Sequence, residues 1–386
     1  MQQEDKKYRL LFCYQNNMNP QQGGVQKVAD LLARFFISRG HQVSYLIHQK
    51  NATDHYDYPV KIYHLPDNNF FSASNIKYYQ SLLEDLDIDI VINHDASNNR
   101  SVLFLNTGNY HCRKISLHHN DPLIRFNSNK KPVGIKKYLP AFILNWHKLI
   151  QTRKELQFLL DNSDQLVLLS SAFIKNIKAK TGIQSTRLTA IGNPVRPVLF
   201  DPAVKKLKHI LFVGRIELQQ KRPDLLLIIW SKLMQLFPDW ELIVLGDGPD
   251  KKWIEQTAKE MRLQRIEFKG FVDPEPYYRD ASIIAMTSDY EGFGMVLAEA
   301  MQYGVVPIAF NNWASLKDII IDMETGVLVT SGDVNSYCSR LAGLISDAAL
   351  RSRLAINVVN HVQKFDISKI GEEWLGIFIA ENLSKG

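Results

Sequence analysis

The sequence predicts an α/β protein of two doubly wound domains, each a parallel sheet with helices on both faces. Short apolar segments alternate with helical segments in both halves of the chain, which is typical of parallel sheets. The alternation stops over residues 192–208, which begin with Gly-Asn-Pro, and restarts at Ile210. The length of 386 residues also fits two domains, because a domain commonly holds about 100–200 residues. We therefore place a domain boundary near residue 195.

The first half is expected to open with a buried strand over residues 8–14. Gly23-Gly24 and a helix with one apolar face follow, and Gly40 ends that helix. A further helix over residues 139–159 follows a basic loop at 127–137. The remaining strands of this half are expected over residues 41–48, 60–65, 87–93, 101–106, 114–117 and 165–170.

The second half shows the same alternation of expected strands and helices. Pro223 suits the first turn of a helix, and a second helix is expected over residues 294–303. The last 40 residues or so have mostly helical character. The strands of this half are expected over residues 210–213, 242–245, 266–268, 283–286 and 305–309.

Composition narrows the functional class. The net charge of +6 permits an anionic substrate or membrane surface, while no pattern of a nucleic-acid-binding module is present. Three cysteines far apart in the chain indicate neither a disulfide framework nor a zinc site, and favour a reducing compartment. The N-terminus lacks the pattern of a signal peptide, and no apolar run approaches the length of a membrane span. We expect a cytoplasmic protein, at most peripheral on the inner face of the plasma membrane.

The first candidate site is the loop Asp289-Tyr290-Glu291-Gly292-Phe293-Gly294, between an expected strand and an expected helix. Glycines let a backbone approach a ligand closely, and N–H groups at a helix start attract phosphate. Glu299 follows Glu291 by eight residues and would point the same way if the helix began at once. Such carboxylates can accept hydrogen bonds from vicinal sugar hydroxyls. Spacing alone equally allows an ordinary capped helix start.

A second strand end carries Gly214-Arg215, with Lys221 shortly after. Arg215 can offer a bidentate fork to a diphosphate, and Lys221 a point charge. Taken alone, Arg215 and Lys221 would more often be cations on the solvated surface. Together with the glycine-rich loop and its carboxylates, they favour a site for a nucleotide diphosphate joined to a polyol.

Metals and redox cofactors are not expected. The D-x-D motifs at residues 85–89 run into an apolar strand instead of closing a metal loop. Gly246-x-Gly248 lacks the third glycine of a dinucleotide fingerprint, which argues against an NAD(P) dehydrogenase. The co-substrate would be a nucleotide-diphosphate sugar, with no further cofactor.

These motifs, in this order, resemble the retaining GT-B glycosyltransferases of family 4, also described as glycosyl transferases group 1. The resemblance covers nearly the whole chain and is carried by Gly23-Gly24-Val25, Asn193-Pro194-Val195, Val213-Gly214-Arg215, Lys221, Gly246-Asp247-Gly248-Pro249, Glu291-x7-Glu299 and Phe365-Asp366 with Trp374. It implies two Rossmann-like domains facing a cleft. Residues 1–195 would form the acceptor domain and 196–365 the donor domain, and a helix over 366–386 would pack back on the first.

The resemblance also implies roles for individual residues. Arg215 and Lys221 would hold the donor diphosphate, Glu299 the ribose, and Glu291 the donor sugar as part of the catalytic centre. His118 or His119 would line the reaction centre; we favour His118, because it directly follows the strand pair Ser116-Leu117, and treat His94-Asp95 as a lesser candidate. The other residues expected to contact the donor are Gly23, Gly24, Gly246, Gly248, Phe271, Val272, Gly292, Phe293, Gly294 and Met295.

The implied function is metal-independent, retaining transfer of a hexose from a nucleotide sugar, with UDP favoured, to a glycan or lipid-linked acceptor. Surface polysaccharide or lipopolysaccharide biosynthesis is the expected setting. The alternatives are a GT-B epimerase, a phosphorylase, for which no cofactor-lysine region is seen, and a non-catalytic sugar-nucleotide-binding module. The basic stretch from Lys130 to Lys154, with Phe142 and Trp146, could rest on anionic lipid. A core helix with a solvated basic face is the alternative that we favour.

Overall fold

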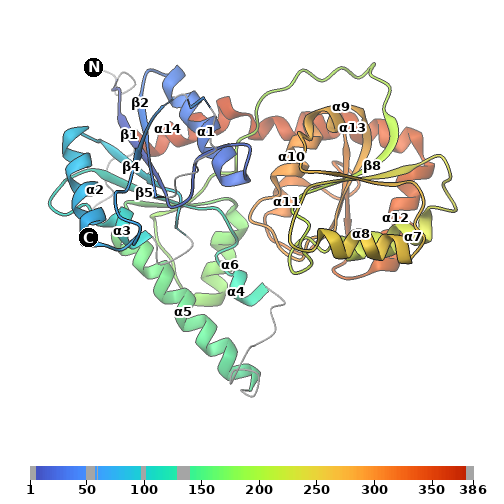
Figure 1. The fold of residues 1–386 in the computed structure, drawn as a ribbon, viewed down its shortest axis with the longest axis horizontal. Helices are drawn as coiled ribbons and strands as arrows, with labels where there is room; N and C mark the ends of the chain where they lie inside the picture. The colour runs from blue at the N-terminus through green and yellow to red at the C-terminus, as the bar shows by residue number, and fades with distance from the viewer. Residues whose placement is uncertain (1–5, 49–56, 59, 97–100, 128–139, 380–386) are drawn as a thin grey trace. The chain divides into compact units, whose positions relative to one another are not determined.

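The computed structural model describes residues 6–48, 57–58, 60–96, 101–127 and 140–379 (Figure 1). The chain divides into two compact units. The first holds residues 1–125, 139–195 and 365–386, and the second holds residues 126–138 and 196–364. The basic loop expected at residues 127–137 lies outside the described residues, apart from Asn127.

The first unit is built on a seven-stranded parallel sheet. The strand order is β3 (Lys61–His64), β2 (Gln42–Ile47), β1 (Arg9–Tyr14), β4 (Ile90–Asn93), β5 (Arg113–His118), β6 (Gln165–Leu168) and β7 (Leu188–Ala190). Its helices are α1 (Gly24–Ser38), α2 (Ala73–Asp85), α3 (Ser101–Leu105), α5 (Ala141–Asn162), α6 (Ser171–Thr181) and α14 (Ile367–Ile379), and the short helix α4 (Ile124–Asn127) begins in this unit. The central strands are buried on both faces, which explains their continuous apolar sequences.

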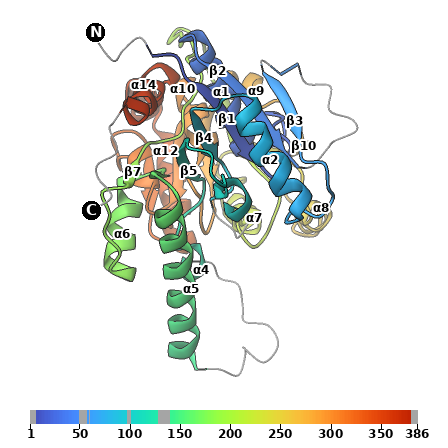
Figure 2. The ribbon, with the colours of Figure 1, turned by 90° about the vertical axis from the view of Figure 1, so that its left-hand side faces the viewer.

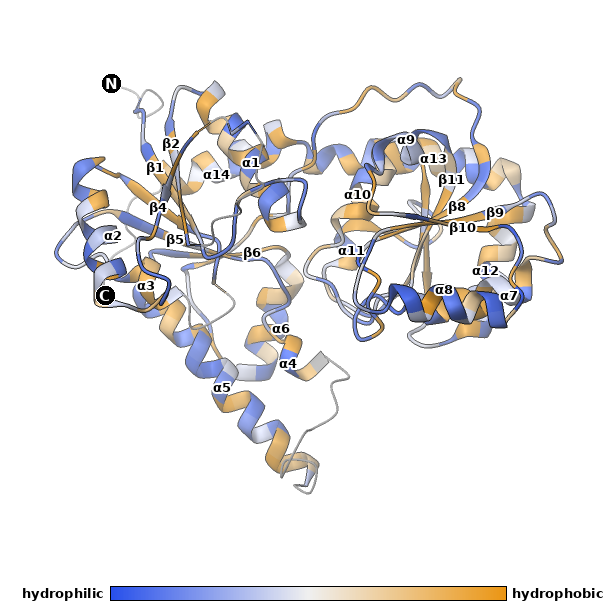
Figure 3. Cartoon of the chain, viewed as in Figure 1, coloured by the Kyte–Doolittle hydropathy of each residue, from blue (hydrophilic) through white to orange (hydrophobic). Residues whose placement is uncertain are grey.

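The second unit is built on a six-stranded parallel sheet. The strand order is β10 (Ile266–Gly270), β9 (Glu241–Leu245), β8 (Leu207–Val213), β11 (Ala281–Met286), β12 (Val306–Phe310) and β13 (Val327–Val329). Its helices are α7 (Pro223–Leu233), α8 (Lys251–Glu260), α9 (Glu275–Asp280), α10 (Met295–Gln302), α11 (Leu316–Ile319), α12 (Val334–Ser346) and α13 (Ala348–Val362), with a 3-10 turn over Gln363–Phe365. Figure 3 shows the apolar strands enclosed between more polar helices.

Both sheets share one topology, which confirms the predicted pair of Rossmann-like folds. In each, the first strand lies inside the sheet and the strand order reverses beside it, between β1 and β4 and between β8 and β11. Ligands of open α/β sheets bind outside the carboxyl ends of strands at such a reversal. The loops after these four strands are therefore where functional side chains are expected.

One expected strand is wrong. Residues 101–106 were expected to form a strand, but Ser101–Leu105 form the short helix α3. Leu103, Phe104 and Leu105 are buried, and the Tyr79 hydroxyl donates to the Phe104 carbonyl at 2.7 Å. A short apolar run fits a buried helix as well as a buried strand, so periodicity alone could not separate them.

The C-terminal helix α14 packs on α1 of the first unit, as predicted. At Gly371 an added Cβ would lie 2.2 Å from the Phe35 ring, so only glycine allows this close approach. Phe378 is buried against Phe36, with their ring centroids 5.0 Å apart. The segment that leads into the second unit pairs with the segment that leads out of it. The Val195 N–H donates a hydrogen bond to the Phe365 carbonyl at 2.8 Å.

Helix α5 is only partly a core helix. Figures 1 and 2 show it extending away from the sheet of the first unit. Its buried residues, Thr152, Leu156, Leu159 and Leu160, all lie in the C-terminal half. Phe142 and Trp146 are 72% and 64% exposed. The favoured expectation of a core helix is therefore wrong for the N-terminal half of α5.

Candidate active site

Gly246 and Gly248 allow the loop that follows β9 to pack closely against the loop that follows β8. A Cβ added at Gly246, whose φ is 141°, would lie 1.9 Å from the Gly214 carbonyl oxygen. A Cβ added at Gly248 would lie 2.3 Å from the carbonyl oxygen of Ile216. These glycines therefore allow the backbone on either side of Arg215 to rest against the neighbouring loop. The Arg215 side chain is 66% exposed and has Glu217 at 3.7 Å, so its guanidinium can still reach a ligand.

Lys221 and Glu291 come together at the strand-order reversal of the second unit. Lys221 Nζ lies 2.5 Å from Glu291 Oε1, and the two side chains are only 16% and 9% exposed. The Ser288 hydroxyl donates to the same Glu291 oxygen at 2.7 Å, and Gln220 Nε2 lies 3.5 Å from the other. A buried charge pair needs such additional hydrogen bonds to offset its loss of hydration. The family resemblance implies that both residues contact the donor, but the sequence does not show that they contact each other.

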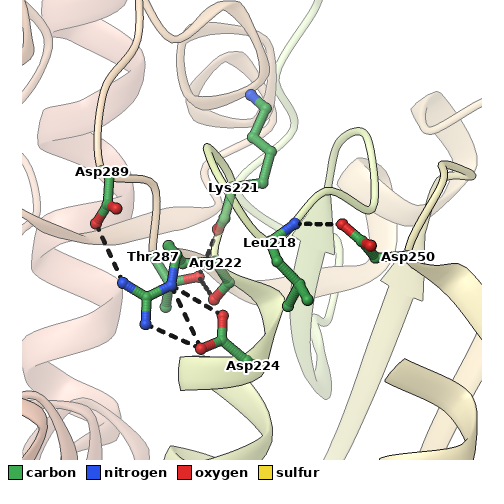
Figure 4. Close-up of polar contacts among 7 residues, drawn as sticks. All are labelled: Leu218, Lys221, Arg222, Asp224, Asp250, Thr287 and Asp289. Carbon is green, nitrogen blue, oxygen red and sulfur yellow. Dashed lines mark hydrogen bonds and ion pairs between the residues drawn. The ribbon is translucent and has the colours of Figure 1, made fainter. Parts of the chain in front are cut away.

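The backbone beneath Lys221 is fixed by a group of residues that we call the β11 clasp: Thr287, Arg222, Asp224 and Asp289 (Figure 4). The Thr287 hydroxyl lies 3.0 Å from the Lys221 carbonyl and 2.8 Å from the Arg222 carbonyl. Arg222 pairs with Asp224 at 2.9 Å and Asp289 at 3.5 Å, and hydrogen bonding to Asp224 raises its pKa. Figure 4 shows the Lys221 side chain pointing away from the clasp.

Arg222 adopts a left-handed backbone conformation, with φ of 51°. This conformation is unfavourable for a residue with a Cβ, and persists where the surroundings over-determine it. Here the surroundings are the two carboxylates and the Thr287 hydroxyl. Sequence reasoning missed Thr287 and Arg222. The available signal was that Thr287 directly follows the buried strand β11.

The glycine-rich loop is held from the loop that follows β12. The Ser315 hydroxyl donates to the Gly292 carbonyl at 2.9 Å, and Trp313 Nε1–H donates to the Phe293 carbonyl at 3.4 Å. Gly294 has φ of 101°, which favours glycine, and α10 begins at the next residue, Met295. The start of α10 therefore has a fixed position, and its N-terminus favours an anion.

The condition for aligning Glu291 with Glu299 along one helix is not met. Helix α10 begins at Met295, so Glu291 lies in the preceding loop and the two residues do not share a helix. Glu299 accepts a hydrogen bond from the buried Tyr278 hydroxyl at 3.4 Å, whereas Glu291 pairs with Lys221. Phe271 and Val272 follow β10 and are 69% and 39% exposed.

The histidines of the first unit have different partners. His118 Nδ1 lies 2.9 Å from the Asn120 carbonyl oxygen, so Nδ1 carries the proton and Nε2 is left as an acceptor. Burial lowers the pKa of His118 to about 4, so it is neutral at pH 7. His119 instead stacks on His94, with Nε2 to Nδ1 at 2.9 Å, and burial lowers the pKa of His94 to about 3. His94 therefore contacts His119 directly. It does not lie apart from the adjacent histidines His118 and His119.

The remaining first-unit candidates also lie at the strand-order reversal. Gly23 and Gly24 form the start of α1 after β1, and the Lys27 N–H donates to the Gly23 carbonyl at 3.0 Å. His94 and Asp95 follow β4, the neighbour of β1. The Asp95 carboxylate accepts a hydrogen bond from the Gln15 N–H, which joins the two loops.

Within the part of the chain that the structure describes, no group of three or more His, Cys, Asp or Glu side chains is placed to hold a metal ion. Asp87 and Asp89 of the D-x-D motif lie 2.6 Å and 3.5 Å from Arg9. Among the described helices, none is both long and apolar enough to cross a bilayer.

Two doubly wound units, with cations and carboxylates at one strand-order reversal and histidines beside the other, define a GT-B glycosyltransferase architecture. Family models match both halves: residues 22–198 match "Glycosyltransferase Family 4", and residues 200–360 match "Glycosyl transferases group 1". The chain belongs to the GT-B glycosyltransferases of family 4.

The chain is similar to an uncharacterized glycosyltransferase of Haemophilus influenzae, with 25% identity over 92% of this chain and 96% of that protein. It is 26% identical to the lipopolysaccharide 1,6-galactosyltransferase of Salmonella typhimurium over 53% of this chain and 58% of the relative, so that match spans little more than half of either protein. The crystal structure of Anabaena HepE in complex with UDP and glucose has the same fold. Its TM-score is 0.73 at 17% identity, with 96% of this chain and 99% of that chain covered.

Proposed function

We propose that this glycosyltransferase moves a hexose from a UDP-sugar to a glycan or lipid-linked acceptor in surface polysaccharide or lipopolysaccharide assembly. The observation that carries the proposal is the buried Lys221–Glu291 pair, which sets a cation for phosphate beside a carboxylate for sugar hydroxyls. The UDP and glucose bound by HepE support the donor class. The galactosyltransferase of Salmonella typhimurium supports the acceptor class.

The mechanism we propose relies on electrostatic stabilisation. Arg215, Lys221 and the N-terminus of α10 would stabilise the negative charge that develops on the departing diphosphate, while the sugar passes through an oxocarbenium-like state. Glu291 would accept hydrogen bonds from sugar hydroxyls, and Nε2 of neutral His118 would accept one more. The acceptor hydroxyl oxygen would bond to the anomeric carbon on the face that the diphosphate leaves, as the bond from that carbon to the diphosphate oxygen breaks. The hydroxyl proton would pass to the departing diphosphate, and the configuration at the anomeric carbon would be retained. No step requires a metal ion or a further cofactor.

The location we propose is the cytoplasm, where nucleotide sugars would be available as donors. Cys13, Cys112 and Cys338 are free thiols, which fits a reducing compartment. The alternatives are a non-catalytic sugar-nucleotide-binding module and a GT-B epimerase. A module would bind a nucleotide sugar without turnover, and an epimerase would return an intact nucleotide sugar with altered configuration.

The test incubates purified protein with a panel of UDP-, GDP- and ADP-sugars and measures release of the nucleoside diphosphate, with EDTA present and absent. We expect slow hydrolysis of a UDP-sugar that EDTA leaves unchanged. Lys221→Ala and Glu291→Ala should each lower turnover about hundredfold or more. Lys208→Ala is the matched control, because Lys208 is an exposed lysine of the same unit paired with Asp239.

Near wild-type turnover in both site variants would contradict the site assignment. Binding without hydrolysis of any nucleotide sugar would favour the non-catalytic module, and an epimerised donor on chromatography would favour the epimerase. Loss of turnover in EDTA, restored by a divalent cation, would contradict metal independence. Nuclear magnetic resonance of the product anomeric centre tests retention.

A further inference from the structure

The N-terminal half of α5, residues 141–150, carries an apolar surface without a described packing partner. Phe142, Ile143 and Trp146 are 72%, 36% and 64% exposed. Residues four apart lie on the same helix face, so Phe142 and Trp146 are neighbours, and Ile150 continues that face. Figure 3 shows apolar stretches along this outer half of α5. Clustered aromatic side chains on a surface mark an interaction site more often than isolated ones do.

Basic residues follow this apolar surface along the described part of α5. Lys148, Arg153 and Lys154 follow on the same helix, and Arg153 and Lys154 are exposed. Arg125 is paired with Glu155, and beyond that pair residues 126–154 contain seven Lys and Arg residues and no Asp or Glu. A partner with negative charge is therefore attracted, whereas a second copy of this segment would be repelled.

We propose that the N-terminal half of α5 docks on the surface of an anionic lipid bilayer. Phe142 and Trp146 would enter the boundary between headgroups and acyl chains, where tryptophan is favoured, and Lys148, Arg153 and Lys154 would lie near lipid phosphates. The helix would lie on the bilayer without crossing it. Aromatic side chains with Lys and Arg nearby are typical of helices that bind at a membrane interface. The inference stands independently of the proposed sugar transfer.

The experiment measures co-sedimentation of the full-length protein with vesicles of phosphatidylcholine alone or with 30 mol% phosphatidylglycerol (about one lipid in three). We expect binding to the anionic vesicles that weakens as salt is raised. Phe142→Ser with Trp146→Ser should lower the partition coefficient about tenfold or more. Lys148→Gln, Arg153→Gln and Lys154→Gln together should remove most of the dependence on phosphatidylglycerol.

The matched control is Leu236→Ser with Trp253→Ser, two residues of the second unit that are 68% and 51% exposed. It should bind vesicles like the wild type. Thermal unfolding of each variant shows whether it remains folded, and UDP release without vesicles should stay unchanged in all of them. That readout separates failure of lipid docking from failure of the proposed transfer.

Equal binding to both kinds of vesicle, or equal binding by the aromatic variant and the control, would overturn the proposal. Light scattering adds a further outcome. If the aromatic variant converts a dimer to a monomer without changing lipid binding, the surface is an interface between copies and the proposal is wrong.

Discussion

Single residues at strand ends determine how the donor-side candidates are held. The sequence could single out Arg215, Lys221 and Glu291 as candidate site residues, because each has a charge and a spacing from a strand that a phosphate or sugar site needs; their contact with a donor stays a prediction. It could not predict that Lys221 touches Glu291 or that His94 stacks on His119, because these pairs are 70 and 25 residues apart and depend on strand order. The sequence also could not show that α10 begins at Met295, so the spacing from Glu291 to Glu299 could not be converted into a shared helix face.

At this scale we predict that Thr287→Val loosens the backbone under Lys221. Thr287 is fully buried, so valine keeps the volume and removes the hydroxyl that the Lys221 and Arg222 carbonyls accept from. The Arg222 carbonyl keeps the Leu225 N–H as a donor, so the main loss falls on the Lys221 carbonyl. We expect the free energy of unfolding to fall by about 1–3 kcal/mol and the KM for the donor to rise. Thr287→Ser keeps the hydroxyl and should restore donor affinity. Equal donor affinity in the valine variant and the wild type would show that the clasp does not position Lys221.

Helices and strands were predictable where an apolar pattern was long or lay between clear turns. The central strands met this condition, and so did α1, α7 and the C-terminal helices. The prediction was wrong at α3, because five residues are too few to show a helical periodicity. It missed β7 and β13, because each strand has only three residues. The apolar face of α5 was visible in the sequence. That it continues beyond the body of the first unit depends on helix length and packing, which the pattern does not show.

Two glycines of α14 allow a test of its packing on α1. At Gly371 a methyl group would meet the Phe35 ring, whereas at Gly376 an added Cβ has no atom within 4 Å. Gly371→Ala should therefore lower the free energy of unfolding by about 1–3 kcal/mol through overpacking. Gly376→Ala should raise it by about 0.5–1 kcal/mol, because alanine is the better helix former. Urea unfolding checks both, and equal signs for the two variants would contradict the described contact.

At the scale of the whole molecule, buried neutral histidines concentrate in the first unit. The pair of doubly wound folds was predictable, because alternating strands and helices leave few other arrangements. The position of His94, His118 and His119 at neighbouring strand ends depends on the order β1-β4-β5 within the sheet. Burial lowers the pKa of all three histidines. Acid should therefore lower the free energy of unfolding of this unit, because the unfolded chain binds protons more readily.

We predict that the first unit loses stability between pH 7 and pH 5. The pKa of His118 is about 4 in the folded state and about 6.5 when unfolded, so only the unfolded chain takes up this proton in that range. The stabilisation that comes from keeping His118 neutral is fully present above its unfolded-state pKa of about 6.5. It is lost progressively as the pH falls toward its folded-state pKa of about 4. His118→Gln should remove about 1–2 kcal/mol of this pH-dependent loss, measured by urea unfolding at each pH. Parallel profiles in variant and wild type would contradict a neutral buried His118.

The return of α14 to α1 also bears on the order in which the protein is made. A ribosome completes residues 1–195 long before it reaches residue 365, yet Phe35 and Phe36 of α1 also pack against α14 through Gly371 and Phe378. Domains generally fold as units during synthesis, with N-terminal domains first. Here the second unit has every residue it needs before the first unit does. The α14-facing side of α1 therefore stays partly exposed until residues 367–379 have been synthesised.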